Sequence, residues 1–335
     1  MKNSFIVFVV IFFIIPVIYH CIYFLVKYSY LRMTNNKGLI NRYREESEGS
    51  KESVYVCITG GSSGIGKRLV YEFVRLGFDI IIIGSKNSYR VMEDIKKNYP
   101  DRHVMVIEKD FNDAYKDDFW FDIEEIFEKL NVRLLVNNVG YRDFSDDFVR
   151  LSNDKIRSII RVGAYPITIL TKLFLKKIRS DGGGLRKGRY GLINITSQAF
   201  TYNLGLGGMM NPLISVPYLD VYEGINAYGL YFSESIYKQY RNLFGAKCDY
   251  LNITPGAVIT EKTEPYLSWL GCLACDSDDF ARNIVNMIGK FEGCHCACYQ
   301  HSLSNVLMFF APFLRDSILR KVGALFSKKC AKITF

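Results

Sequence analysis

The 335-residue sequence lacks several features that would indicate a specialised architecture. It has no internal repeat, so an array of stacked units is not expected. Lys and Arg exceed Asp and Glu to give a net charge of +9, but they form no concentrated tract of the kind that binds nucleic acid. Trp occurs only twice, whereas 24 Phe and 23 Tyr supply material for a hydrophobic core. We therefore expect one large globular domain or two smaller ones, with no nucleic-acid partner.

Full charges are absent from residues 5–26, a hydrophobic run long enough to cross a ~30 Å hydrocarbon layer as a helix. A cleaved signal peptide would have a shorter hydrophobic region and end at small residues. This run is followed instead by Lys27 and Tyr28. The sequence predicts a retained transmembrane anchor over residues 1–30 and a polar linker over residues 31–52.

More basic residues follow the hydrophobic run than precede it. Lys2 lies before it, and Lys27, Arg32, Lys37, Arg42 and Arg44 lie after it. The positive-inside rule then places the rest of the chain in the cytosol, and the net charge favours attraction to an anionic membrane surface. The tail, residues 301–335, mixes basic and apolar residues. It is either an amphipathic helix on the membrane or a helix packed on the domain.

The nine cysteines do not form a clear metal site. Cys272 and Cys275 make a CxxC, and residues 294–298 read CHCAC. Zinc binds thiolates and imidazoles, but strict alternation would place these three cysteines on one face of a strand. We interpret them as reduced core cysteines of a cytosolic protein, with a zinc site as the alternative, and predict no metal.

Beyond residue 52, apolar strand-like runs alternate with amphipathic stretches, a pattern typical of βαβ units and a parallel sheet. The six expected strands cover residues 54–59, 79–84, 103–108, 133–138, 190–196 and 248–254. The helices expected between them cover residues 64–76, 89–98, 117–130, 154–179 and 221–244. The pattern predicts one doubly wound α/β Rossmann domain over residues 53–300.

A glycine-rich segment, Thr59-Gly60-Gly61-Ser62-Ser63-Gly64-Ile65-Gly66, directly follows the first strand and opens a helix. Glycine lets the backbone turn tightly and approach a pyrophosphate, and the helix N-terminus supplies N–H donors. The TGxxxGxG spacing resembles the short-chain dehydrogenase/reductase family. The residues of this segment expected to contact the nucleotide are Gly60, Ser62, Ser63, Gly64, Ile65 and Gly66.

Three further features lie where that family would place them. Asp110, after the third strand, resembles the acidic residue that accepts a hydrogen bond from the adenine amino group. Asn137-Asn138-Val139-Gly140 resembles the family's NNAG motif, in which Asn137 and Gly140 would contact the cofactor. Pro255-Gly256, after the sixth strand, resembles the turn beside the nicotinamide.

The end of the second strand, Gly84-Ser85-Lys86-Asn87, has no carboxylate, although an NAD enzyme would offer one to the ribose 2′-hydroxyl. Ser85 and Lys86 can instead hold a 2′-phosphate, with Lys67 or Arg90 assisting. NADPH is therefore the predicted cofactor.

The catalytic residues that the resemblance implies are only partly present. Ser197 matches the family's Ser, with Thr196 as a neighbouring hydroxyl, and Tyr222 matches the Tyr that donates a proton. The Lys expected four residues later is Asn226, and no YxxxK occurs after Ser197. A phenol has a pKa near ~10, and Asn supplies no charge that favours the phenolate. Either another cation such as Lys262 substitutes, or the protein binds nucleotide and reduces little.

The family also has an Asn on the long helix before the fifth strand. The residues that fall near that position here are Ile160, Arg161 and Gly163. Family dimers form through the long helices that begin at Asp154 and Val221, so a homodimer is expected by analogy. The extra residues 204–217 either line an acyl-chain groove or form a disordered insertion.

Within the family, the chain is most similar to the 3-ketodihydrosphingosine reductases. The similarity lies in the N-terminal anchor, TGGSSGIGK through Lys67, TSQA at residues 196–199 and Tyr165-Pro166. The next branch is that of the very-long-chain 3-oxoacyl-CoA reductases and 17β-hydroxysteroid dehydrogenases. Both imply an endoplasmic reticulum enzyme with a single N-terminal span and a cytosolic domain that reduces a lipid ketone with NADPH. The contrasting hypothesis is an NADPH-binding scaffold without turnover.

Overall fold

The computed structural model describes residues 15–44, 53–140, 148–182, 189–197 and 219–302. The extra residues 204–217 and the tail beyond Ser302 lie outside these ranges, so the predictions made for them stay predictions. Much of the hydrophobic run also precedes residue 15, and the prediction that it spans a membrane is not tested.

The central sheet has seven parallel strands in the order β3-β2-β1-β4-β5-β6-β9. Its strands are β1 Tyr55–Thr59, β2 Asp79–Gly84, β3 Val104–Glu108, β4 Val132–Asn137, β5 Tyr190–Ile195, β6 Cys248–Ile253 and β9 Gly293–His295. The short strands β7 Val258–Ile259 and β8 Cys275–Asp276 pair separately. The parallel α/β fold predicted from the sequence is confirmed.

Helices connect the strands. The α-helices are α2 Ile15–Met33, α3 Leu39–Tyr43, α4 Gly64–Arg75, α5 Ser88–Asn98, α6 Phe121–Lys129, α7 Asn153–Ser180, α8 Asp220–Phe244, α9 Glu264–Leu267 and α10 Ser277–Met287. The 3-10 turns are η2 Phe111–Asp113, η3 Asp117–Trp120, η4 Phe148–Arg150, η5 Gly245–Lys247 and η6 Ser268–Leu273. Asp276 caps the N-terminus of α10, because its carboxylate accepts from the N–H groups of Asp278 and Asp279.

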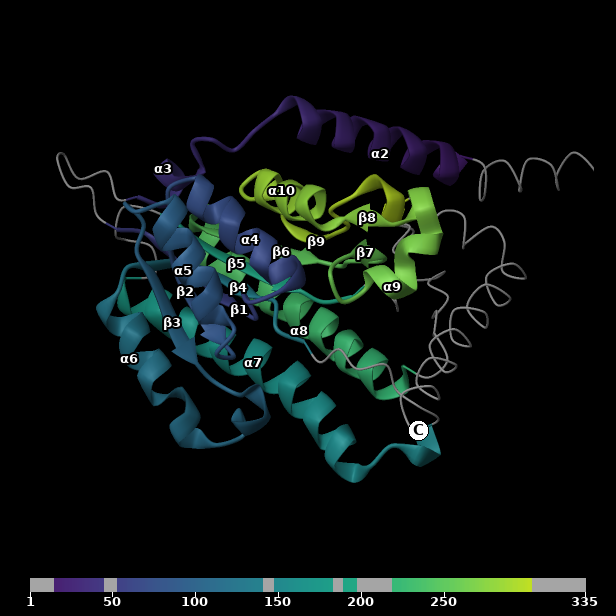
Figure 1. Ribbon diagram of the computed structural model, residues 1–335. Coiled ribbons are helices and arrows are strands. Elements are labelled where there is room, and N and C mark those ends of the chain that lie inside the picture. Colours follow the sequence, from purple (N-terminus) through teal and green to yellow (C-terminus); the bar gives the residue numbers. More distant parts are fainter. Residues whose placement is uncertain (1–14, 45–52, 141–147, 183–188, 198–218, 303–335) are drawn as a thin grey trace, which may run out of the picture.

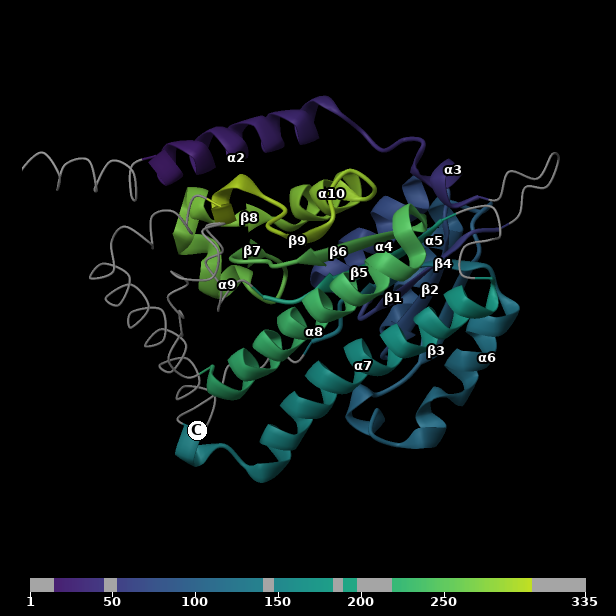
Figure 2. The ribbon, with the colours of Figure 1, turned by 180° about the vertical axis from the view of Figure 1, so that it is seen from behind.

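Three layers result, with α4, α5 and α10 on one face of the sheet and α6, α7 and α8 on the other (Figures 1 and 2). Strands β1, β2 and β4 are buried between the layers, as their continuous apolar runs predict. Strand β3 was expected to be buried too, but it is the edge strand and alternates between covered and exposed side chains. Met105, for example, is 38% exposed because no further strand lies beyond it.

Helix α7 is the one helix of the described residues that is long and apolar enough, by length and composition alone, to cross a membrane. Half of its most apolar stretch is buried, and Leu170, Phe174 and Ile178 pack in the core between the sheet and α6. These contacts are those of a core helix in a folded domain.

The N-terminal helices α2 and α3 both lie against the Rossmann domain (Figures 1 and 2). Helix α2 lies on the outer side of α10, and α3 lies near Gly77, which follows α4. Leu31, Leu39 and Tyr43 are at most 3% exposed and belong to the same core as α4 and α10. The Nδ2 atom of Asn36 donates to the carbonyl of Val285, 2.7 Å away.

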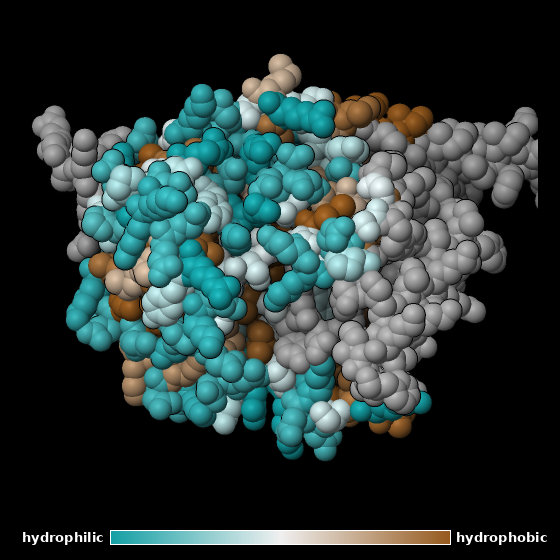
Figure 3. All heavy atoms as spheres, in the orientation of Figure 1, coloured by the Kyte–Doolittle hydropathy of each residue, from teal (hydrophilic) through white to brown (hydrophobic). Residues whose placement is uncertain are grey.

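The predicted polar linker over residues 31–52 therefore needs correction in its described part. Residues 31–44 include apolar side chains whose burial stabilises a docked conformation more than a free linker. The opposite side of α2 is apolar and exposed, with Ile18, Leu25 and Val26 each more than half exposed, and Figure 3 shows hydrophobic atoms along this helix.

Candidate active site

The glycine-rich turn lies at the carboxyl end of β1, where the strand order reverses between β1 and β4. Open α/β sheets bind ligands at such a switch point. Gly60 and Gly64 have φ of +68° and +55°, a region that favours glycine. A Cβ on Gly66 would lie 2.4 Å from both the Gly60 carbonyl oxygen and the Asn138 Nδ2 atom. The turn is thus packed so closely that only glycine fits at position 66.

Ser62 and Ser63 are half-buried at the N-terminus of α4. Ser63 is the N-cap residue, but its side chain makes no capping hydrogen bond. The first N–H groups of a helix lack partners within it, and an anion such as a pyrophosphate suits them. Ile65 is only 2% exposed and packs in the core, so its contribution to a nucleotide site is to seat the helix.

Residues after β4 hold the glycine-rich turn in place. The Oγ1 atom of Thr59 accepts from the backbone N–H groups of Asn138 and Val139, each at 2.9 Å. The Nδ2 atom of Asn138 donates to the Thr59 carbonyl, also at 2.9 Å. Asn138 was not among the predicted site residues, although its place in the NNVG motif is the signal that could have identified it.

Asn137, which was predicted to contact the cofactor, is 3% exposed and lies inside the sheet. Its Nδ2 atom donates to Asn194 Oδ1 at 2.8 Å and to Thr171 Oγ1 at 3.1 Å. Alternate residues of a strand face opposite sides, so Asn137 points toward α7 while Asn138 reaches the turn. Gly140 is exposed and has open space around its Cα.

A loop carboxylate also reaches the N-terminus of α4. The pKa of Glu261 is lowered by a hydrogen bond from its own backbone, by the nearby Arg68 and Lys67 cations, and by the Gly64 N–H group. Arg68 lies 3.6 Å from Glu261 and 3.2 Å from Asp278. Glu261 thus lies where a bound phosphate would also be attracted, and Lys262 follows it in the exposed loop.

The ends of β2 and β3 carry the residues predicted to hold the adenosine half of a nucleotide. Ser85 and Lys86 are exposed just beyond β2, and Arg90 is exposed in the first turn of α5. Asp110 is exposed beyond β3, where its Oδ1 atom accepts from Asn112 N and Nδ2, each at 3.0 Å.

The predicted catalytic residues come from the end of β5 and the start of α8. Ser197 is half-buried two residues beyond β5, and Tyr222 is half-buried in the first turn of α8. Thr196 is 8% exposed and its Oγ1 atom donates to Asn252 Oδ1 at 3.2 Å. Ser197 is therefore the hydroxyl of this pair that is more open to a substrate.

Asn226 lies one turn after Tyr222, and its Nδ2 atom donates to the Tyr222 carbonyl at 2.8 Å. A lysine in this place would extend a charged amine beyond the helix, whereas the amide of Asn226 donates to the backbone of its own helix. Beside it, Ile225 packs against Gly163 so closely that a Cβ on Gly163 would lie 2.2 Å from Ile225 Cγ2. Arg161 stacks on Tyr115, with 4.0 Å between its Cζ atom and the ring centre.

The Pro255-Gly256 turn follows β6, at the same edge of the sheet as the glycine-rich turn. The Gly256 N–H donates to Nδ1 of His301 at 3.2 Å. His301 was placed at the start of the tail, yet it is 1% exposed and belongs to the domain.

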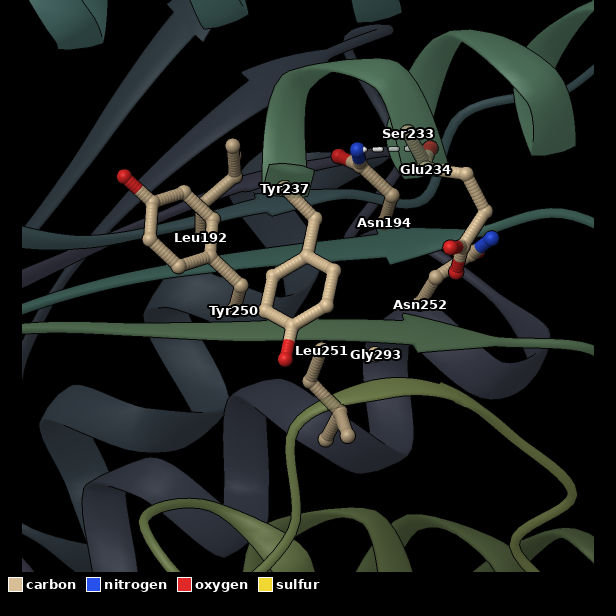
Figure 4. Close-up of a pocket in the computed structure, with 9 residues that line it drawn as sticks. All are labelled: Leu192, Asn194, Ser233, Glu234, Tyr237, Tyr250, Leu251, Asn252 and Gly293. Carbon is tan, nitrogen blue, oxygen red and sulfur yellow. Dashed lines mark hydrogen bonds between the residues drawn. The ribbon is translucent and has the colours of Figure 1, made fainter. Parts of the chain in front are cut away.

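A small separate hollow lies between α8 and strands β5 and β6 (Figure 4). It is lined by Leu192, Asn194, Ser233, Glu234, Tyr237, Tyr250, Leu251, Asn252 and Gly293. Asn194 Nδ2 donates to Ser233 Oγ at 2.9 Å across it. None of the predicted catalytic or nucleotide-binding residues lines this hollow, so it is not the candidate active site.

No group of three or more His, Cys, Asp or Glu side chains is placed to hold a metal ion within the described ranges. Burial raises the pKa of the Cys294 thiol to about 12, and it raises that of Cys298 further. Both thiols are therefore protonated at neutral pH in this structure.

Comparison with known proteins agrees with this geometry. The family model for short chain dehydrogenases matches residues 54–207. Human 17-beta-hydroxysteroid dehydrogenase type 3 is 27% identical over 254 residues, which cover 74% of this chain and 72% of the relative. The very-long-chain 3-oxoacyl-CoA reductase of Vanderwaltozyma polyspora is 29% identical over 191 residues, which cover 56% of this chain and 51% of the relative.

Solved structures support the fold. A 7beta-hydroxysteroid dehydrogenase superposes with a TM-score of 0.64 at 16% identity, covering 84% of this chain and 98% of its own. A short-chain dehydrogenase from Sphingobium yanoikuyae in complex with NADPH gives a TM-score of 0.57 at 17% identity, covering 77% and 95%. Over residues 54–207 the chain is thus similar to the short chain dehydrogenase family, and it shares the fold of these solved dehydrogenases.

Proposed function

We propose that this protein is an NADPH-dependent reductase of a lipid ketone, anchored to the endoplasmic reticulum membrane. The observation that carries the proposal is the arrangement at the carboxyl edge of the sheet. There the glycine-rich turn follows β1 and Ser197 follows β5, while Tyr222 lies in the first turn of α8. The match of residues 54–207 to the short chain dehydrogenase family model supports ketone–alcohol oxidoreduction as the class of reaction.

The described residues fit a dinucleotide. Gly66 packs against the Gly60 carbonyl and Asn138, which holds the turn in a tight form at the N-terminus of α4, where a pyrophosphate would bind. Ser85, Lys86 and Arg90 are exposed where the ribose 2′-position would lie, and residues 84–90 contain no carboxylate. A cationic and hydroxyl-bearing site suits a 2′-phosphate, which supports NADPH over NADH.

Bound NADPH would supply a hydride to the carbonyl carbon. The Ser197 hydroxyl would donate a hydrogen bond to the carbonyl oxygen, and Tyr222 would deliver a proton to that oxygen as negative charge develops. Asn226 can donate a hydrogen bond but offers no positive charge beside the phenol. A positioned acid typically contributes about 10²–10⁴-fold, so we expect slow turnover unless another cation such as Lys262 takes this role.

The relatives favour the runner-up branch of the sequence interpretation. They bear the names of a 17-beta-hydroxysteroid dehydrogenase and a very-long-chain 3-oxoacyl-CoA reductase. We therefore propose a steroid ketone or a 3-oxoacyl thioester as the first substrate class to test, with 3-ketodihydrosphingosine as the second. The exposed apolar face of α2, continuous with the hydrophobic run before it, supports the membrane anchor. A homodimer remains a proposal by analogy.

The test uses the full-length chain in detergent or nanodiscs, because α2 and α3 are packed into the domain. NADPH binding is measured first, and NADPH oxidation is then followed with each of the three ketones. Binding with turnover on one ketone supports the reductase, and binding without turnover supports the scaffold hypothesis. No binding of NADPH refutes both.

Asn226→Lys separates a weak catalyst from a scaffold. The lysine amine would favour the Tyr222 phenolate, so kcat should rise by roughly 10-fold or more if the substrate site is intact. Asn226→Gln is the matched control, because it lengthens the side chain without adding charge. If lysine leaves turnover at background while NADPH still binds, the substrate site itself is absent.

A further inference from the structure

His301 is a buried histidine to which the proposed reaction assigns no role. It is 1% exposed and its ring lies 5.6 Å from that of Phe280 on α10. Its two ring nitrogens both contact the backbone that follows β6. Nδ1 accepts from the Gly256 N–H at 3.2 Å, and Nε2 lies 3.1 Å from the Ala257 carbonyl oxygen.

This geometry selects one form of the imidazole. Nδ1 must carry a lone pair to accept from Gly256, and Nε2 must carry the proton to donate to Ala257. A neutral ring with its proton on Nε2 satisfies both contacts, whereas a protonated ring would direct an N–H at the Gly256 N–H. Burial lowers the pKa of His301 to about 4, so the neutral form is present at physiological pH.

The two contacts are not equivalent. The Ala257 carbonyl also accepts from the backbone N–H of Cys275 at 2.8 Å, so it keeps a partner without His301. Gly256 itself is exposed, and its N–H donates to Nδ1 in a part-buried hydrogen bond that orients this peptide. His301 therefore fixes the orientation of the Gly256 peptide, one residue beyond Pro255.

We propose that His301 is a positioning residue, which holds the Pro255–Gly256 turn in the conformation that binds the nicotinamide half of the cofactor. The proposal rests on the proposed NADPH site. The turn follows β6 and therefore lies at the carboxyl edge of the parallel sheet, where α/β proteins bind their ligands.

The segment that carries His301 is itself held by the N-terminal helix α2. The Tyr28 hydroxyl lies 2.8 Å from the Cys298 carbonyl oxygen and 3.0 Å from the Ser302 hydroxyl. The Nζ atom of Lys27 donates to the Cys296 carbonyl at 2.9 Å. Contacts thus run without a gap from α2 through residues 296–302 to the Gly256 turn.

Three substitutions in the full-length chain test the role. His301→Ala removes both contacts and should weaken NADPH binding by up to about tenfold, the scale of one net hydrogen bond. His301→Asn places an oxygen near the Nδ1 position and should restore affinity to within about threefold of wild type. His301→Gln reaches the Nε2 position instead and should bind as weakly as the alanine variant.

His295→Asn is the matched control. His295 ends β9, directly before that segment, and its half-buried side chain has its Nε2 atom 3.0 Å from the Glu292 carbonyl. Its own carbonyl accepts from the Thr254 N–H at 3.1 Å, a backbone contact that the substitution keeps. It should leave NADPH affinity unchanged. A merely structural role would lower thermal stability in all three His301 variants without separating asparagine from glutamine in affinity.

If the alanine variant does not fold, the asparagine and glutamine variants still decide the matter. A second measurement uses the wild-type chain with ¹⁵N-labelled histidine, of which it has four. We expect His301 to show the Nε2-protonated tautomer and a shift on NADPH addition. Equal NADPH affinity in the three variants, or a His301 signal that NADPH does not move, overturns the proposal. Wild type that binds no NADPH overturns the proposed function itself.

Discussion

The ion pair between Arg42 and Asp249 provides the sharpest stability prediction, because it joins the N-terminal segment to the amino end of strand β6. Arg42 Nε and Nη2 donate to the two carboxylate oxygens of Asp249 at 2.8 and 2.6 Å. The Tyr43 hydroxyl donates to the same carboxylate at 2.6 Å. The Asp249 side chain is 5% exposed and that of Arg42 is 29% exposed.

Arg42→Met keeps most of the apolar stem but leaves a buried carboxylate short of a cation. Breaking a fully buried pair in this way costs about 3–5 kcal/mol. Arg42 is only partly buried, Tyr43 still donates, and Arg189 lies 3.9 Å from the carboxylate. We therefore expect a loss of about 2–3 kcal/mol, or a fall in Tm of roughly 4–12 °C.

Thermal unfolding of the full-length chain in detergent measures this effect. Asp249 lies at the amino end of β6, opposite the edge that carries the glycine-rich turn, so NADPH affinity should stay unchanged. Asp249→Asn in the Arg42→Met background should recover part of the loss, because it removes the unpaired charge. Arg282→Met, which breaks an exposed pair with Asp279, should shift Tm by less than 1–2 °C. A Tm unchanged by Arg42→Met would refute the argument that this segment is docked through the pair.

Three further predictions concern the site. Gly66→Ala should abolish measurable NADPH binding in a fluorescence titration, because the added Cβ has no space. Gly224→Ala is the control, since its Cβ would meet nothing within 4 Å. It should leave NADPH binding intact and add up to about 1 kcal/mol of stability. Weakened binding in both variants would contradict the packing argument. Glu261→Gln should tighten NADPH binding a few-fold at low salt, because the carboxylate next to the α4 N-terminus repels a pyrophosphate; unchanged affinity would place Glu261 away from the phosphates. Burial lowers the pKa of His301 from its ordinary value of 6.5 to about 4 in the folded chain, so the unfolded chain binds the extra proton between these values. The free energy of unfolding should therefore fall by roughly 3 kcal/mol as pH falls through this window. Urea melts from pH 7 to pH 4 should show a shallower fall for His301→Asn, and parallel curves would count against a neutral buried ring.

The sequence predicted the sheet well because its strands are continuous apolar runs that only burial on both faces explains. The six expected strands match β1 to β6 to within one residue at nearly every end. The glycine-rich turn was also predictable, since a tight turn between a strand and a helix leaves a local sequence pattern. Strand β9 and helix α10 were not predicted. Strand β9 leaves little local signal, because it is three residues long and pairs with β6 alone.

Other features depend on contacts between distant residues and left little local signal. Asn137 and Asn138 are adjacent amides, and only the phase of β4 decides which of them meets the turn. His301 looked like part of a basic tail, because its partners lie 44 and 45 residues earlier in the chain. Neither assignment follows from residue type or spacing.

The N-terminal segment changes how the proposed anchor relates to the site. A flexible linker would let the domain tumble beside the membrane, and its removal would leave the domain intact. In this structure, however, Tyr28, Leu31 and Tyr43 are buried in the domain, and Tyr28 contacts the segment that carries His301. A chain begun at Ser53 would therefore lose part of its core as well as its anchor. If the anchor enters a bilayer, the docked α2 would also fix how the carboxyl edge of the sheet, with its proposed cofactor site, is oriented toward the membrane. An enzyme whose substrate is dissolved in lipid needs such a fixed orientation.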